Sequence, residues 1–175
     1  GIPVSFLEFL KSKGINTIRI RQWVNPIDQH SSFEEVKSFT ETLKSIGFKI
    51  YLSLHYSDTW ADPGNQITPL DWQNVSYITL KAIVYDYTKM IVEQIDPDII
   101  QIGNEINNGF LHPEGNRYSE PNQFLELLNE GIRAVRDHAS GQTKIMLHFA
   151  GHDESDIFFD FVDGLDYDII GISFY

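Results

Sequence analysis

Short runs of alternating aliphatic and polar residues separate longer stretches with helical spacing along the whole chain. In each short run, isoleucine or leucine occupies every second position, which is the period of a β-strand. The runs predicted as strands cover residues 17–23, 49–55, 99–105, 144–149 and 168–175. Strands that alternate with helices are typical of βα units around a parallel sheet, so the pattern predicts an α/β fold.

The stretches between these strands repeat apolar residues at intervals of three and four, the spacing of one helix face. After the first strand, Ser32 and Glu35 have capping-box spacing and Gly47 is placed to end the helix. Further helices are predicted at the N-terminus up to Gly14 and over residues 80–95, 124–135 and 155–162. The chain has no repeat of fixed period and no linker, so residues 1–175 are interpreted as one domain.

The side of each strand that lacks aliphatic residues narrows the fold further. It carries Arg19, Arg21 and Trp23; Tyr51, Ser53 and His55; Gln101, Gly103 and Glu105; His148; and Gly171, Ser173 and Tyr175. A doubly wound sheet has helices on both faces and needs apolar side chains on both. One polar face instead fits a (β/α)₈ TIM barrel, where the aliphatic side packs under the outer helices.

The length of each βα unit indicates that the barrel is present only in part. Five strands in 175 residues correspond to about 35 residues per unit, or roughly 280 for eight units, near the usual size of such barrels. We therefore expect five parallel strands in an open arc, with the polar face on the concave side. A flavodoxin-like five-stranded sheet is the alternative.

Composition excludes several classes of partner. The net charge is −12, from 13 Lys and Arg against 25 Asp and Glu, so there is no basic stripe for nucleic acid. No apolar stretch approaches the roughly 20 residues that a membrane-spanning helix requires. The chain has no cysteine, which removes disulfides and thiolate chemistry.

Glu105 is the strongest candidate for a catalytic group. It closes the third predicted strand in IIQIGNEINNG, where Gly103 is interpreted as leaving space and the Asn104 amide as a partner for a substrate hydroxyl. A carboxylic acid in this position can protonate a leaving oxygen. The alternative is a structural ion pair of Glu105 with Arg19 or Arg21.

The segment LHYSDTWADPGNQ after the second strand contains His55, Asp58, Trp60 and Asp62. This mixture suits a shaped loop that holds a polar ligand against an aromatic face. Two acids and a histidine could also bind a metal ion, but the chain lacks HExxH or another strong ligand spacing, so no metal is predicted.

Other histidines and aromatic residues are weaker candidates. His148 and His152 straddle a strand end, where hydrogen-bonded polar groups at the mouth of the sheet are the favoured interpretation. Aromatic residues that could stack on sugar rings or pack within loops are Trp23, Trp60, Trp72 and Phe110. No motif for dinucleotide, nucleoside triphosphate or serine-hydrolase chemistry is present.

The runs TIRIRQWVNP, LHYSDTWADPGNQITP, IIQIGNEINNGFLHPEG, KIMLHFAG and DYDIIGISFY resemble glycoside hydrolase family 53, the endo-β-1,4-galactanases that cleave the galactan of type I arabinogalactan. The resemblance implies a retaining hydrolase with a (β/α)₈ barrel, of which this chain holds strands two to six. It implies β-1,4-galactan as partner and a secreted, periplasmic or cell-surface location. It implies no catalytic cofactor; some relatives hold a structural calcium ion in a part of the barrel that this chain does not reach.

The resemblance also implies roles for single residues. Glu105 matches the acid/base, Asn104 its substrate-binding neighbour, Arg19 the arginine that supports the nucleophile, His55 a histidine near the same centre, and Tyr175 the aromatic residue beside it. Residues also predicted to contact substrate are Asp58, Trp60, Asp62 and His148.

The nucleophile, a second Glu, is then expected outside this chain. Two alternatives stay open: another endo-β-glycanase of the same clan, acting on mannan or glucan, and a non-catalytic sugar-binding barrel.

Overall fold

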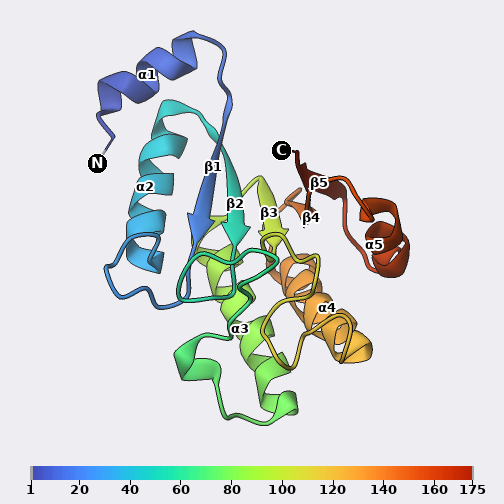
Figure 1. The fold of residues 1–175 in the computed structure, drawn as a ribbon. Helices are drawn as coiled ribbons and strands as arrows, with labels where there is room; N and C mark the ends of the chain where they lie inside the picture. Colours follow the sequence, from blue (N-terminus) through green and yellow to red (C-terminus); the bar gives the residue numbers. More distant parts are fainter. Residues whose placement is uncertain (1, 175) are drawn as a thin grey trace.

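A computed structural model describes residues 2–174, and its strands form one parallel sheet (Figure 1). The strands are β1 (Thr17–Gln22), β2 (Lys49–Leu54), β3 (Ile99–Ile102), β4 (Lys144–Ala150) and β5 (Ile169–Ser173). The helices are α1 (Val4–Ser12), α2 (Phe33–Ile46), α3 (Tyr77–Ile95), α4 (Pro121–His138), α5 (Ser155–Val162) and the short 3₁₀ helix η1 (Leu70–Trp72). Each predicted strand and helix is confirmed; α5 has the predicted bounds, and most of the other elements differ from the prediction at one or both ends.

The order of the strands decides the architecture. It is β1-β2-β3-β4-β5, with every neighbouring pair parallel. Because βα crossovers are right-handed, an order that never reverses keeps all connecting helices on one face of the sheet. Figure 1 shows the helices following one side of the sheet in this way. The order excludes the flavodoxin-like alternative, which needs a reversal, and confirms the open five-stranded arc.

The aliphatic face of the central strands forms the core. Side chains there with no exposed surface are Ile50, Leu52, Leu54, Ile100, Ile102, Ile145 and Leu147. The prediction that aliphatic residues pack under outer helices is wrong for β5, where Ile170 is 53% and Ile172 45% exposed. These two side chains lie on the last strand of the described residues, so no described helix follows to cover them.

Helix ends follow the capping chemistry of the sequence with one difference. The Ser32 hydroxyl accepts a hydrogen bond from the Glu35 N–H (3.4 Å), but the Glu35 carboxylate reaches back to the N–H of Ser31 (2.6 Å) rather than Ser32. Gly47 ends α2 in the left-handed region at φ 90°. Helix α3 begins three residues before the predicted start, because Ser76 caps it through the N–H of Thr79.

Two aspartates, Asp98 and Asp168, hold the starts of β3 and β5 at the amino ends of the strands. The segments Asp-Pro-Asp-Ile-Ile and Asp-Tyr-Asp-Ile-Ile precede and open β3 and β5. Asp98 accepts a hydrogen bond from the N–H of Ile50 (2.8 Å), and Asp168 accepts one from the N–H of Ile145 (2.8 Å). Each carboxylate therefore ties its own strand to the second residue of the preceding strand.

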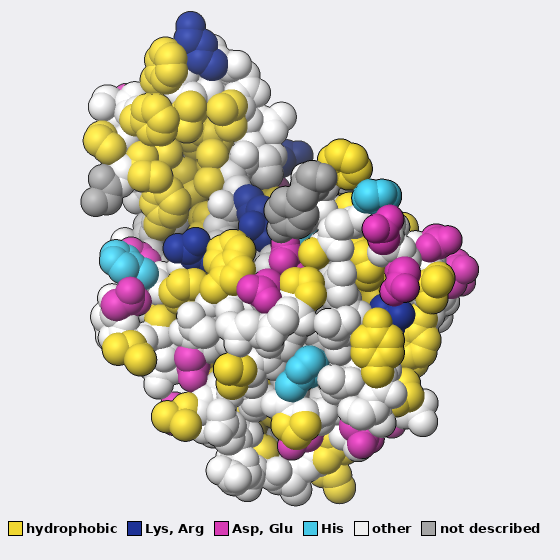
Figure 2. Space-filling view, viewed as in Figure 1, with side chains coloured by type: hydrophobic (Ala, Val, Ile, Leu, Met, Phe, Trp, Pro, Cys, Tyr) yellow, Lys and Arg dark blue, Asp and Glu magenta, His cyan; other side chains and the backbone are white. Residues whose placement is uncertain are grey.

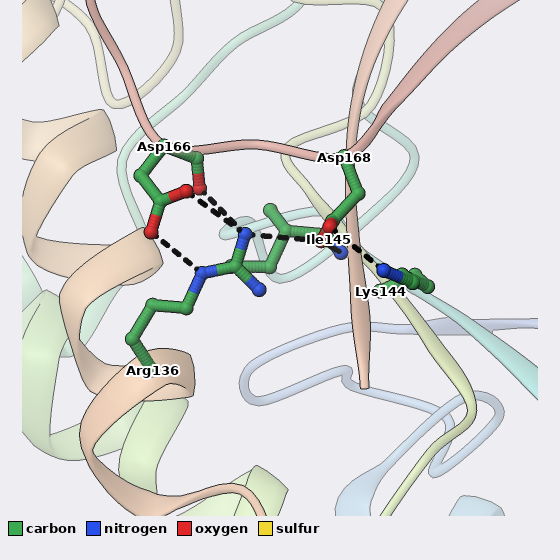
Figure 3. Close-up of polar contacts among 5 residues, drawn as sticks. All are labelled: Arg136, Lys144, Ile145, Asp166 and Asp168. Atoms are coloured by element: carbon green, nitrogen blue, oxygen red, sulfur yellow. Dashed lines mark hydrogen bonds and ion pairs between the residues drawn. The ribbon is translucent and has the colours of Figure 1, made fainter. Parts of the chain in front are cut away.

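Asp168 has two further partners (Figure 3). The Arg136 guanidinium lies 3.0 Å and the Lys144 ammonium 3.1 Å from its oxygens. Burial raises the pKa of Asp168, but the hydrogen bonds from Ile145, Lys144 and Arg136 together hold it below its usual value. Asp168 was predicted to open the strand; it lies one residue before β5, where its side chain serves as a clamp.

Candidate active site

The polar residues of the sheet converge on the guanidinium of Arg19, at the carboxyl ends of the strands. Its Nη2 donates to Asn104 Oδ1 (2.8 Å), Ser53 Oγ (3.1 Å) and Gln101 Oε1 (3.3 Å). Arg19 thus joins β1 to β2 and to the turn after β3. Side chains of the predicted polar face thus meet one another, and the partners of Arg19 among these contacts are neutral groups.

Asn104 is buried, and its amide is occupied by the protein. Nδ2 donates to the carbonyl of Ala61 (2.8 Å), while Oδ1 accepts from Arg19 and from Gln101 Nε2 (3.1 Å). The backbone is held as well, since Gln66 donates to the carbonyls of Asn104 (2.9 Å) and Glu105 (3.2 Å). These bonds fix the turn that carries Glu105, and contact of Asn104 with substrate stays a prediction.

Glu105 lies in a tight turn beyond the strand, because β3 ends at Ile102. Its backbone adopts the left-handed region, with φ 51°, and the residue is only 6% exposed. Gly103 has φ 79°, and a Cβ there would lie 2.5 Å from Ile106 Cγ2. The interpretation that Gly103 leaves space below Glu105 is therefore wrong; glycine is needed for the turn itself.

Contacts from β4 and β5 hold both the backbone and the carboxylate of Glu105. The Glu105 N–H donates to His148 Nδ1 (3.1 Å), and the N–H of Ile106 donates to the His148 carbonyl (3.0 Å). Ser173 Oγ donates to Glu105 Oε1 (3.0 Å) and lies 3.1 Å from His148 Nε2. Both ring nitrogens of His148 are thus engaged within the protein, as in the interpretation of His148 as a hydrogen-bonded group at the mouth.

Two buried histidines stay uncharged at neutral pH. Burial lowers the pKa of His55 to about 3, and the charges of Arg19 and Arg21 add to the effect. Burial and Arg19 lower the pKa of His148 to about 4, although Glu105 opposes the shift. His55 Nδ1 accepts from the N–H of Ala61 (3.0 Å), so its proton belongs on Nε2.

An aromatic and cationic surface lies beside this centre. The Arg21 guanidinium is 4.9 Å from the ring centroid of Trp23 and 5.5 Å from that of Trp60. The Trp60 ring also meets His55 edge-on at 5.2 Å. Trp60 is 40% exposed, so part of its ring is open to a ligand.

The acidic residues of the same loop shape the backbone. Asp58 accepts from the N–H groups of Asn25 (2.9 Å) and Leu70 (2.8 Å). Asp62 accepts from the N–H of Gly64 (2.8 Å). Both carboxylates therefore hold the backbone of the loop, and contact of either residue with substrate stays a prediction.

Other predicted residues lie away from the centre or beyond the description. Trp72 is 8% exposed and Phe110 fully buried, and both pack in the core, so neither can stack on a sugar. His152 is exposed and lies 3.1 Å from Asp153. Tyr175 lies outside the described residues.

Four further side chains of the site, Ser53, Gln66, Gln101 and Ser173, are not marked as functional by any sequence motif. Ser53, Gln101 and Ser173 were recognised on the polar face of their strands, and that alternation was the signal for them. Gln66 comes from a loop with no periodicity.

Within residues 2–174, no three His, Asp or Glu side chains are grouped as metal ligands, and no described helix combines the length and apolarity needed to cross a membrane.

Comparison with known proteins identifies the family. Residues 1–175 match the model of Glycosyl hydrolase family 53 over their whole length. The chain belongs to glycosyl hydrolase family 53. A probable arabinogalactan endo-β-1,4-galactanase A of Aspergillus terreus is 39% identical over 95% of the chain and 52% of its own length. Arabinogalactan endo-β-1,4-galactanase A of Emericella nidulans is 37% identical over 100% of the chain and 54% of its own length.

Solved family 53 structures share the fold described above. The GH53 catalytic domain of Ignisphaera aggregans superimposes with a TM-score of 0.88 at 38% identity, over 97% of this chain and 51% of that one. A structure from a study of two fungal β-1,4-galactanases gives 0.89 at 30% identity, over 97% and 55%. The chain therefore spans about half the length of its family 53 relatives, and its five parallel strands match part of their barrel.

Proposed function

We propose that the whole protein is an endo-acting, retaining galactanase that hydrolyses the β-1,4-galactan of type I arabinogalactan, with Glu105 as its acid/base. The observation that carries this proposal is the buried Glu105 at the carboxyl ends of the strands, whose backbone is held by His148 of β4 and whose carboxylate is held by Ser173 of β5. Active sites of such barrels lie at this end. The substrate class comes from the names of the relatives.

In the proposed reaction, Glu105 first acts as an acid. It gives its proton to the glycosidic oxygen while a second carboxylate attacks the anomeric carbon, so the bond to the leaving sugar breaks and a glycosyl-enzyme forms. Glu105 then takes a proton from water, whose oxygen attacks the same carbon and releases the sugar from the nucleophile. The two carboxyl groups of such enzymes lie about 5 to 5.5 Å apart.

The remaining parts of the proposed site follow from this chain covering barrel strands two to six. The nucleophile is then a Glu in the part of the whole protein that this chain does not include. In keeping with the resemblance, Arg19 is proposed to support this nucleophile; in the present chain its guanidinium donates to Asn104 and Gln101. Trp60 offers its exposed ring to a sugar face. Because a galactan polymer does not enter cells, we propose that the whole protein acts outside the cytoplasm.

The role of Glu105 is tested by Glu105→Gln in the full-length protein. Turnover of galactan should fall by roughly 10² to 10⁴, the usual contribution of acid–base assistance. An aryl galactoside with a good leaving group should lose less in the first step, and azide should speed release of the glycosyl-enzyme. Glu41→Gln, at an exposed position on α2, is the matched control. Equal losses on both substrates without azide rescue would contradict the acid/base role.

Substrate choice is tested by assays on β-1,4-galactan, β-mannan and soluble cellulose with the full-length protein. We expect the fastest release of reducing ends from galactan. The axial hydroxyl of galactose redirects the chain, so a groove that fits it leaves polar groups unpaired with the other polymers. Faster cleavage of mannan or cellulose would favour another endo-β-glycanase activity, and binding without turnover would favour a sugar-binding protein.

A further inference from the structure

Three hydrogen bonds form a closed ring between β4, β5 and the turn after β3. They run from the Glu105 N–H to His148 Nδ1 (3.1 Å), between His148 Nε2 and Ser173 Oγ (3.1 Å), and from Ser173 Oγ to Glu105 Oε1 (3.0 Å). The ring starts and ends on one residue, once at its backbone and once at its carboxylate. It therefore couples the position of the Glu105 backbone to the orientation of its side chain.

The number of hydrogens available fixes which group donates and which accepts in each of the three hydrogen bonds. His148 Nδ1 accepts from a backbone N–H, so the proton of the neutral imidazole is on Nε2. That N–H donates to Ser173, whose single hydroxyl hydrogen is left for Glu105 Oε1. Burial lowers the pKa of His148 to about 4. The imidazole is therefore neutral at pH 7 and keeps this tautomer.

His148 also holds the unusual backbone of Glu105. A residue with a Cβ rarely adopts the left-handed region, and one that does is held there by its surroundings. Glu105 has φ 51°, and the N–H groups of Glu105 and Ile106 both donate to His148, one to the ring and one to the carbonyl. His148 of β4 thus holds the turn that presents the carboxylate, in addition to the bonds from Gln66.

The neighbouring strand leaves room for this arrangement at one glycine. Gly171 is the register partner of His148. A Cβ at Gly171 would lie 3.1 Å from His148 Cδ2 and 2.6 Å from Met146 Sδ. The imidazole can lie beside β5, within reach of Ser173, because residue 171 has no side chain.

We propose that His148 and Ser173 are positioning residues for Glu105. His148 holds the backbone of the turn, and the Ser173 hydroxyl orients the carboxylate through Oε1. This inference rests on the proposed acid/base function of Glu105.

The test compares Ser173→Ala and Ser173→Thr in the full-length protein. Ser173→Ala leaves Oε1 without this donor, and kcat on galactan should fall roughly ten- to a hundredfold, the order of loss that follows small misplacement of a reacting group. KM should change less than about twofold, and an aryl galactoside with a good leaving group should lose less. Ser173→Thr keeps the hydroxyl and should restore most of kcat.

Glu105→Gln measured in parallel separates the two hypotheses. If Glu105→Gln abolishes galactan turnover and Ser173→Ala leaves kcat unchanged, the positioning inference is overturned and the acid/base role stands. If Glu105→Gln keeps full activity, the acid/base role itself fails. A loss in Ser173→Ala that is equal on both substrates, or that Ser173→Thr does not restore, indicates a merely structural serine and also overturns the inference.

A second readout does not depend on any variant folding. Long-range ¹H–¹⁵N spectra of the unmutated full-length protein at pH 7 should show His148 as the neutral tautomer with its proton on Nε2, slow to exchange. The exposed His152 serves as the internal reference with fast exchange. A charged His148, or a proton on Nδ1, would break the ring of hydrogen bonds and overturn the inference.

Discussion

At the scale of the residue, two histidines of the candidate site make the same kind of hydrogen bond. His55 and His148 each accept a backbone N–H with Nδ1, from Ala61 and from Glu105. Both are buried and both lie in the field of Arg19, so each pKa is lowered, to about 3 and about 4. Neutral imidazoles in a fixed tautomer suit the proposed role of Glu105, because the geometry around it would stay the same as its carboxyl group gained and lost a proton.

The same burial predicts how stability depends on pH. In the unfolded chain both histidines have a pKa near 6.5, so below that pH the unfolded state binds protons that the folded state does not. The free energy of unfolding should therefore fall as the pH drops from about 7 to 5, by roughly 1 to 2 kcal/mol for each histidine. Urea unfolding at the two pH values measures this loss.

Single variants assign the loss to its source. His148→Gln should show a smaller drop between pH 7 and pH 5 than the parent, because one of the two linked protons is gone. His152→Gln, at an exposed position, should show the parent's drop. Equal pH dependence in the parent and His148→Gln would mean that His148 titrates alike in the folded and unfolded states.

At the scale of the element, contacts at both ends of the strands hold the register of the sheet. Arg19 links β1 and β2 to the turn after β3 at the carboxyl ends. Asp98 and Asp168 tie β3 to β2 and β5 to β4 at the opposite ends. A strand shifted by one residue would turn its polar face outward, so these contacts help keep Glu105, His148 and Ser173 on the same side.

Asp168→Ala should destabilise the protein by about 1 to 2 kcal/mol at pH 7, since it removes a charged acceptor from the N–H of Ile145. Asp168→Asn should cost less, because an amide oxygen can still accept that bond. The folded carboxyl has a lowered pKa, so its stabilisation is present above the unfolded value near 3.8 and lost as the pH falls below it.

Urea unfolding of the variants at pH 7 and pH 3 measures both effects. Asp160→Ala, at an exposed position on α5, is the control for losing a surface carboxylate. We expect the difference between Asp168→Ala and the parent to shrink at pH 3. If Asp168→Ala and Asp160→Ala were equally stable at pH 7, the clamp would contribute nothing.

At the scale of the whole molecule, apolar side chains are exposed near both edges of the sheet. Figure 2 shows hydrophobic side chains gathered over α1, where Ile2, Val4, Phe6 and Phe9 are each about half exposed. On the other side, Ile170, Ile172 and Phe174 are exposed along β5. Within the described residues β1 and β5 each pair on one side only, which leaves backbone groups free to pair with further strands.

We expect residues 1–175 expressed alone to release no reducing ends from galactan and to unfold at lower urea than the full-length protein. The open sheet exposes apolar surface that a closed barrel would bury, and Glu105 lacks the proposed second carboxylate for covalent catalysis. Reducing-end assays and urea unfolding of both proteins, side by side, measure the difference. Galactan turnover by these 175 residues alone would show that the nucleophile lies within them.

Local patterns in the amino-acid sequence were enough to predict the elements, the polar face and the family. Alternation of period two marked all five strands, and cap residues such as Ser32 and Gly47 marked helix ends, because these signals lie within a few neighbouring residues. The motifs around Glu105 and Trp60 were long enough to indicate family 53 before any fold was known. Local pattern also placed Ser53, Gln101 and Ser173 on the face that holds the site.

Which of these residues contact one another depends on how the strands and loops pack in three dimensions. It ended β3 at Ile102 and put Glu105 in a left-handed turn, buried Trp72 and Phe110 in the core, and joined Ser173 to a carboxylate 68 positions earlier in the chain. A period-two pattern says which face a side chain occupies but not which strand lies beside it. That choice depends on strand order and register, which are set by packing between residues far apart in the sequence.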